Sequence, residues 1–203
     1  RPVLPDLPER PGLSAPAADG VPQQLVDRYG RTVRDLRLSI TDRCNLRCTY
    51  CMPAQGLQWL PTPDLLTTAE LTRLGRLAVE RLGVERIRLT GGEPLLRRDL
   101  EEIIGSLSAL RTSTGVKPDI ALTTNGLGLE KRAAGLRAAG LDRVNISIDS
   151  LDPQDYAAIT RRDRLADVLT GIAGAQEAGL DPIKVNAVAV PATVEERAPR
   201  LLA

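Results

Sequence analysis

A phrase that occurs three times, at residues 83–87, 140–144 and 179–183, limits the folds open to this chain. Each copy has a glycine, an aliphatic residue, an acidic residue and an arginine or proline before isoleucine or valine. Glycine commonly follows the last turn of a helix, whereas β-branched residues favour strands. Each copy therefore predicts a helix that ends, a tight turn and a strand that begins. Regular alternation of this kind gives a parallel sheet with right-handed crossovers, either an open sheet or a partial barrel.

Strands and helices can be placed along the rest of the chain by the same reasoning. Strands are expected over residues 35–41, 84–90, 118–124, 143–149 and 182–189. Thr67 and Glu70 have the spacing of a capping box at the start of a helix, a second helix follows Asp99, and a third covers about 129–140. Asp152 and Pro153 begin the connection that ends at Gly179. The expected apolar sides are Leu71, Leu74, Leu77 and Ala78 in the first helix, Leu100, Ile103, Ile104, Leu107 and Leu110 in the second, and Leu165, Val168, Leu169, Ile172 and Ala175 in the last.

Apolar and polar residues alternate within each predicted strand. In the fourth strand, for example, the apolar set Val144, Ile146 and Ile148 alternates with the polar set Asn145, Ser147 and Asp149. Strands of a parallel sheet that is buried on both faces are instead almost continuously apolar. We therefore expect one polar face, which lines a lumen for a large polar ligand if helices cover the other face. The alternative is a polar face that is simply exposed to solvent.

Composition narrows the range of partners. The chain has 203 residues, a formal charge of +1 and four aromatic residues, so it lacks both the basic field and the stacking platforms of nucleic-acid-binding proteins. No apolar run approaches the ~20 residues of a membrane span, and neither nucleic acid nor membrane is an expected partner. Prolines crowd the first 22 residues, which predicts a disordered tail over 1–24 ahead of one domain over 25–203. A proline-rich docking ligand is the alternative for that tail.

All three cysteines, Cys44, Cys48 and Cys51, lie in one short segment after the first predicted strand. An odd, clustered set argues against a disulfide framework and indicates a reducing, cytoplasmic location. Three thiols with no histidine anywhere in the chain could complete a zinc site only with a carboxylate or a second chain. Three thiolates can hold an iron–sulfur cluster that keeps one iron open to a chelating ligand. We favour the cluster, with zinc and inert buried thiols as the alternatives.

The spacing Cys-x3-Cys-x-aromatic-Cys, with Tyr50 before the last cysteine, is joined by Gly91-Gly92-Glu93-Pro94 at the end of the second strand. Together these motifs resemble the radical S-adenosylmethionine (SAM) enzymes. The resemblance implies a truncated (β/α) TIM-like partial barrel with a polar lumen. It also implies a [4Fe-4S] cluster on Cys44, Cys48 and Cys51, and SAM that is cleaved to a 5′-deoxyadenosyl radical. Rival interpretations are a non-catalytic iron–sulfur or zinc-binding module and a radical SAM enzyme that matures peptides.

Further phrases are similar to those of the GTP 3′,8-cyclase family: 35–44, 51–53, 87–95, 122–126, 144–149 and 184–186. The resemblance implies conversion of GTP to (8S)-3′,8-cyclo-7,8-dihydroguanosine 5′-triphosphate, the first step of molybdenum cofactor biosynthesis. It implies SAM contacts from Tyr50, Gly92 and Ser147, and GTP contacts from Arg37, Arg88, Thr123 and Lys184. No further catalytic residue is implied. Because the chain has no P-loop, scattered cations on the polar face would hold the triphosphate.

The same resemblance implies partners and missing parts. It implies cyclic pyranopterin monophosphate synthase as the downstream enzyme and a cellular electron donor, and it is compatible with a homodimer. The family has a C-terminal region with three more cysteines for a second [4Fe-4S] cluster, and this sequence does not contain them. The chain also begins at Arg1 and stops in a helical pattern at 199–203. We therefore expect an N-terminal fragment, truncated after the fifth strand and by itself inactive or unstable.

Overall fold

The computed structural model describes residues 24–190, 195 and 199 and has one parallel sheet at its centre. The strands are β1 (Asp35–Ser39), β2 (Arg86–Thr90), β3 (Asp119–Thr124), β4 (Arg143–Ser147) and β5 (Ile183–Asn186), in the order β1-β2-β3-β4-β5. All neighbouring pairs are parallel, as predicted, and each strand lies within its expected range. The sheet is not closed, which makes it a partial barrel. The tail predicted for 1–24 falls outside the described residues apart from its last one.

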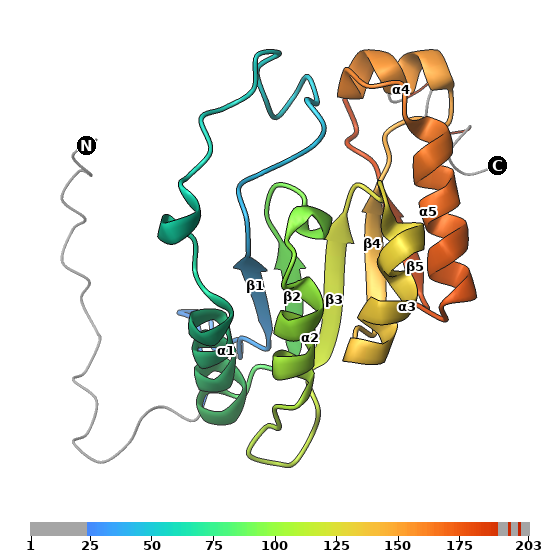
Figure 1. Cartoon of the computed structure of the whole chain (residues 1–203). Helices are drawn as coiled ribbons and strands as arrows, with labels where there is room; N and C mark the ends of the chain where they lie inside the picture. The colour runs from blue at the N-terminus through green and yellow to red at the C-terminus, as the bar shows by residue number, and fades with distance from the viewer. Residues whose placement is uncertain (1–23, 191–194, 196–198, 200–203) are drawn as a thin grey trace, which may run out of the picture.

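The helices α1 (Thr68–Arg76), α2 (Leu100–Ser108), α3 (Leu129–Ala139) and α5 (Leu165–Glu177) lie along one face of the sheet (Figure 1). The shorter α4 (Pro153–Thr160) lies beyond the carboxyl ends of the strands (Figure 1). A π-helical segment, η2 (Leu77–Arg81), extends α1, and the 3-10 turns η1 (Thr62–Asp64) and η3 (Pro94–Leu96) lie in the connections. Within the part of the chain that the structure describes, no helix has the length and apolar character needed to cross a membrane.

Capping residues in the sequence predicted the ends of these helices correctly. Thr67 and Glu70 form the predicted capping box, in which each side chain accepts a hydrogen bond from the other residue's backbone N–H. Asp152 caps α4 by accepting hydrogen bonds from the N–H groups of Gln154 and Asp155. Gly140 ends α3 in the left-handed conformation, with φ of 107°.

The predicted apolar side was right for α2 but wrong at two positions of the first helix and at one position of α5. Leu74 and Leu77 are 42% and 48% exposed, and Leu169 is 43% exposed. Glycines occupy the contacts instead. A Cβ on Gly75 would lie 2.2 Å from Leu107 Cδ2, and a Cβ on Gly171 would lie 2.3 Å from a backbone oxygen of Gly126. The helices therefore pack so closely at these two contacts that only glycine fits there. Leu74, Leu77 and Leu169, which were predicted to be buried because they are apolar, lie outside the contacts.

The register confirms that the polar residues of all five strands share one face, because the alternate apolar residues pack into the core with α1, α2, α3 and α5. Figure 1 shows these helices along one face of the sheet. We call this the polar face, and it has successive levels along the strands. At the amino end, Asp35 pairs with Arg86 and Asp119 with Arg143. The next level holds Arg37, Arg88 and Arg143; Arg37 and Arg88 are register partners, and Arg143 reaches back to Asp119. The level after that holds Ser39, Thr90, Thr123, Asn145 and Lys184.

Candidate active site

The three cysteines lie on the loop that follows β1, and α4 holds this loop in place. The N–H groups of Arg47 and Thr49 donate to the carbonyls of Thr160 and Ile159 at 3.1 and 2.9 Å. Arg161 returns from the end of α4 and donates to the carbonyls of Arg47 and Met52, both at 2.9 Å. All four of these hydrogen bonds use backbone groups of the loop.

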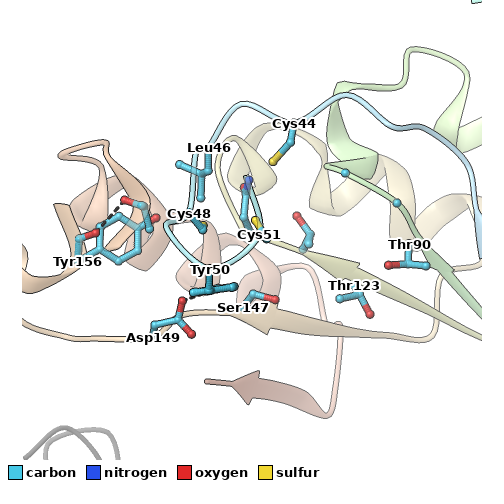
Figure 2. Close-up of a pocket in the computed structure, with 15 residues that line it drawn as sticks. Cys44, Leu46, Cys48, Tyr50, Cys51, Thr90, Thr123, Ser147, Asp149 and Tyr156 are labelled. Atoms are coloured by element: carbon cyan, nitrogen blue, oxygen red, sulfur yellow. Dashed lines mark hydrogen bonds between the residues drawn. The ribbon is translucent and has the colours of Figure 1, made fainter. Parts of the chain in front are cut away.

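The cysteine loop and the carboxyl ends of β2, β3 and β4 enclose a cavity of about 180 Å³ (Figure 2). Its lining includes all three cysteines, and it has both hydroxyl and aromatic groups. The lining residues are Cys44, Leu46, Cys48, Tyr50, Cys51, Thr90, Gly91, Gly92, Thr123, Thr124, Asn125, Ser147, Asp149, Tyr156 and Thr160. The carboxyl ends of strands in an open α/β sheet are where ligands usually bind.

Gly91 and Gly92 allow the end of β2 to touch the cysteine loop. A Cβ on Gly91 would lie 2.2 Å from the carbonyl oxygen of Thr41, and a Cβ on Gly92 would lie 2.3 Å from that of Arg43. The backbones are joined by hydrogen bonds from Gly92 N to Thr41 O at 2.8 Å and from Glu93 N to Arg43 O at 2.7 Å. Glycine is needed here because any side chain would separate the two loops.

Glu93 was not predicted as a site residue, but its fully buried carboxylate organises the same region. It accepts hydrogen bonds from Leu95 N at 2.9 Å, from the Thr124 hydroxyl at 2.7 Å and from Asn125 N at 2.7 Å. Burial raises the pKa of Glu93, while these hydrogen bonds lower it. The carboxylate therefore ties the Gly-Gly-Glu-Pro turn to the end of β3. The motif itself was the only sequence signal, since Thr124 and Asn125 come from a distant part of the chain.

Asp149 is a second residue that sequence reasoning missed as a site residue. Its Oδ2 accepts a hydrogen bond from the Tyr50 hydroxyl at 2.7 Å (Figure 2), and its Oδ1 accepts one from Val188 N at 2.8 Å. Burial, together with the neighbouring Asp149 carboxylate, raises the pKa of Tyr50, so the phenol stays protonated and donates. Asp149 thus joins the cysteine loop, the end of β4 and the segment after β5. The available signal was its place in the alternation, two residues after Ser147.

Tyr156 brings a further polar group into the cavity wall from α4. Its hydroxyl is buried and has no partner among the residues that the structure describes. Burial raises the pKa of Tyr156 to about 12, so the hydroxyl remains a donor at neutral pH.

The thiols suit a role as ligands of a cluster. Cys44 and Cys48 are half-buried and Cys51 is exposed, and burial raises the pKa of Cys44 and raises that of Cys48 to about 11. Such thiols are poor nucleophiles at neutral pH, and a bound cation would favour their thiolates. Within residues 24–190, 195 and 199, no three cysteine, aspartate or glutamate side chains gather closely enough to enclose one metal ion. Three thiols that line one cavity, in a chain without histidine, fit an iron–sulfur cluster, which thiolates hold.

The structure divides the predicted site residues into two groups. The three cysteines line the cavity, and so do Tyr50, Gly92 and Ser147, the residues expected at SAM, and Thr123 from the set expected at GTP. Arg37, Arg88 and Lys184 do not line this cavity but lie on the same polar face. Arg37 and Arg88 are one level nearer the amino ends of the strands than Thr123, and Lys184 is level with it.

Comparison with known proteins decides the family. A model of the radical SAM superfamily matches residues 38–202, most of the chain. The chain belongs to the radical SAM superfamily. Membership supports SAM and one [4Fe-4S] cluster as its cofactors, and the donors and cavity described above fit them.

Similar sequences are named GTP 3′,8-cyclase. The protein of this name from Corynebacterium glutamicum is 62% identical over 180 residues, which are 89% of this chain and 48% of that protein. One from Mycobacterium sp. (strain KMS) is 58% identical over 194 residues, 95% of this chain and 54% of that protein. The chain thus spans about half the length of the curated relatives it matches.

Solved structures agree on the radical SAM fold. Streptococcus suis SuiB bound to the precursor peptide SuiA matches with a TM-score of 0.68 at 19% identity, over 83% of this chain and 36% of that one. Native anSMEcpe with bound AdoMet matches with a TM-score of 0.64 at 19% identity, over 83% of this chain and 48% of that one. Identities this low show the fold alone.

Proposed function

We propose that the full-length protein is a GTP 3′,8-cyclase, which forms (8S)-3′,8-cyclo-7,8-dihydroguanosine 5′-triphosphate in the first step of molybdenum cofactor biosynthesis. The observation that carries this proposal is a set of unpaired cations beside the cysteine-lined cavity. Arg37, Arg88 and Lys184 have no ion-pair partner among the described residues, and all lie on the polar face. Relatives named GTP 3′,8-cyclase, 58–62% identical to this chain, support the choice of substrate.

The arginines at the amino end of the polar face form ion pairs, which distinguishes them from Arg37, Arg88 and Lys184. Arg86 pairs with Asp35, and Arg143 pairs with Asp119, whereas the neighbouring Arg37 and Arg88 have no ion-pair partner among the described residues. The Nε of Arg88 is buried and has no partner in the described part of the chain. A buried, unpaired guanidinium N–H is costly, and a phosphate oxygen would satisfy it. The triphosphate would therefore lie over Arg37 and Arg88, with Lys184 beside it.

The chain's own residues would hold the reactants in order along the strands. Cys44, Cys48 and Cys51 would hold the cluster, and Tyr50, Gly92 and Ser147 would contact SAM at the carboxyl end of the sheet. When bound, the cluster and SAM would supply the radical chemistry that removes the 3′ hydrogen of GTP and lets this carbon bond to C8 of guanine. Thr123 lines the cavity one level beyond Arg37 and Arg88, where its hydroxyl can bind the nucleoside. The protein's part is to align the sugar with SAM and to exclude water.

Several finer assignments belong to the same proposal. We take residues 25–203 as one radical SAM domain and place the full-length protein in the cytoplasm. It would carry a second [4Fe-4S] cluster, receive electrons from a cellular donor, pass its product to cyclic pyranopterin monophosphate synthase and be compatible with a homodimer.

Anaerobic turnover tests the proposal. The full-length protein with reconstituted cluster, given GTP, SAM and a reductant, should consume GTP and form 5′-deoxyadenosine in step with it. A Cys48→Ser variant is the matched control and should do neither. Formation of 5′-deoxyadenosine without loss of GTP would refute the cyclase and favour another radical SAM reaction.

A further inference from the structure

Asn145, in the middle of β4, is a buried polar residue that the fold does not explain. It is 3% exposed, although the helices α1, α2, α3 and α5 lie on the other face of the sheet (Figure 1). Its Nδ2 has no hydrogen-bond partner within the described residues. Leaving a buried amide donor unpaired destabilises a protein, so such a group commonly has a partner that the polypeptide does not provide.

Asn125, the other buried asparagine, shows what a structural role looks like. Its Nδ2 donates to Asn45 Oδ1 at 2.7 Å, and its Oδ1 accepts from Leu127 N at 3.0 Å. Both ends of that amide are satisfied, and they fix the loop after β3. Asn145 has no comparable contacts among the residues described, although it lies in a regular strand between two others.

The neighbours of Asn145 indicate which part of a ligand it would meet. Its register partners are Thr123 on β3, which lines the cavity, and Lys184 on β5. Ser147, two residues further along β4, also lines the cavity. Two residues span about 6.6 Å along a strand, so Asn145 lies one level beyond Arg37 and Arg88, on the level of Thr123 in the cavity wall. A neutral amide at this level suits an uncharged oxygen of the sugar or base rather than a phosphate.

We infer that Asn145 is a substrate-binding residue, whose Nδ2 donates a hydrogen bond to an uncharged oxygen of the nucleoside part of GTP. This inference rests on the proposed function and adds a residue to the binding site. It follows that the unpaired amide is satisfied only in the nucleotide complex. Removing it should weaken GTP binding without weakening the nucleotide-free fold, which is the opposite of what a structural asparagine would do.

The test uses the full-length protein with its cluster reconstituted and SAM present. Asn145→Leu, of similar size, and Asn145→Ala, which cannot overpack, are compared with the wild type. Thr112→Val is the matched control, since Thr112 is buried and polar but lies between α2 and β3, outside the strands of the polar face. Calorimetric titration with GTP should show about tenfold weaker binding in both Asn145 variants and no change in the control. The melting temperature without GTP should not fall in Asn145→Leu, and the SAM-induced change in the electron paramagnetic resonance spectrum of the reduced cluster should persist.

Each other outcome overturns the inference in a distinguishable way. If the wild type binds GTP and both Asn145 variants bind it equally well, Asn145 is not a substrate residue, whereas the proposed function stands. If both variants melt at lower temperature without GTP, the amide is structural. If the SAM response is lost while GTP binding is kept, Asn145 acts on the cofactor. If the wild type itself does not bind GTP, the proposed function fails and the inference fails with it.

Discussion

The substitution Gly92→Ala tests how much the contact between the end of β2 and the cysteine loop contributes to stability. Gly92 has no left-handed φ, so alanine is compatible with its backbone conformation and the added methyl group is the only perturbation. That methyl group would lie 2.3 Å from Arg43 O and 2.5 Å from Asp42 O, and both of these atoms belong to backbone. No flexible side chain can move aside, so the two loops must separate.

The magnitude follows from what this separation breaks. The hydrogen bonds from Gly92 N to Thr41 O and from Glu93 N to Arg43 O would lengthen or break, at about 0.5–1.5 kcal/mol each. The strain of forcing a methyl group into a filled site is about 1–3 kcal/mol. Together these predict that the free energy of unfolding falls by about 2–6 kcal/mol, a large share of the stability of a domain.

Gly105→Ala provides the matched control. Gly105 lies within α2, and a Cβ there would meet nothing closer than 3.9 Å. Alanine should therefore stabilise the helix by about 0.5–1 kcal/mol. Urea denaturation gives the free energies, and iron analysis after reconstitution reports whether the cysteine loop still holds a cluster. Normal stability and full iron content in Gly92→Ala would show that the two loops are not held together by this contact.

Three further predictions concern the polar face and its supports. Tyr50→Phe removes the hydrogen bond to Asp149 and should lower stability by about 1–2 kcal/mol in urea denaturation and weaken SAM binding; unchanged values for both would contradict the bridge. Arg88→Ala should weaken GTP binding at least tenfold in calorimetry while uncoupled cleavage of SAM persists, and equal loss of both would count against a phosphate contact. The hydrogen bond from Arg97 lowers the pKa of Asp99 from 3.8 to about 2. Asp99 therefore stabilises the fold above pH ~4, and this contribution disappears as the pH falls toward ~2. Asp99→Asn should flatten the acid side of a plot of stability against pH, and an unchanged slope there would argue against this ion pair.

Sequence periodicity predicted the strands and the polar face because both depend on near neighbours in the chain. It failed on α1 and α5 for a physical reason. Gly75 and Gly171 give the helices their close approach, and a glycine has no hydrophobic signature in a helical pattern. Leu74 and Leu169 were chosen because they are apolar, but the glycine contacts turn them toward solvent.

Site residues that depend on distant partners were also beyond sequence reasoning. Glu93 accepts a hydrogen bond from the end of β3, about 30 residues away, and Asp149 accepts one from Tyr50, about 100 residues away. The cysteines could be found because their spacing is local and no other thiol or imidazole competes with them. Local spacing thus predicted a group of thiols that the fold places around one cavity, whereas the residues that support this cavity required the fold.

For the cations of the polar face, the strand register gives information that the alternation of polar and apolar residues in the sequence cannot give. Alternation places Arg37, Arg86, Arg88 and Arg143 on one face but cannot say which of them are free. Register sets Arg86 against Asp35, and Arg143 reaches back to Asp119, which leaves Arg37 and Arg88 adjacent and without an ion-pair partner among the described residues. Two neighbouring guanidinium groups repel each other unless an anion lies between them. Under the proposed function a bound triphosphate would relieve this repulsion, and the neutral amide of Asn145 lies one level closer to the cysteines, where the uncharged nucleoside would follow.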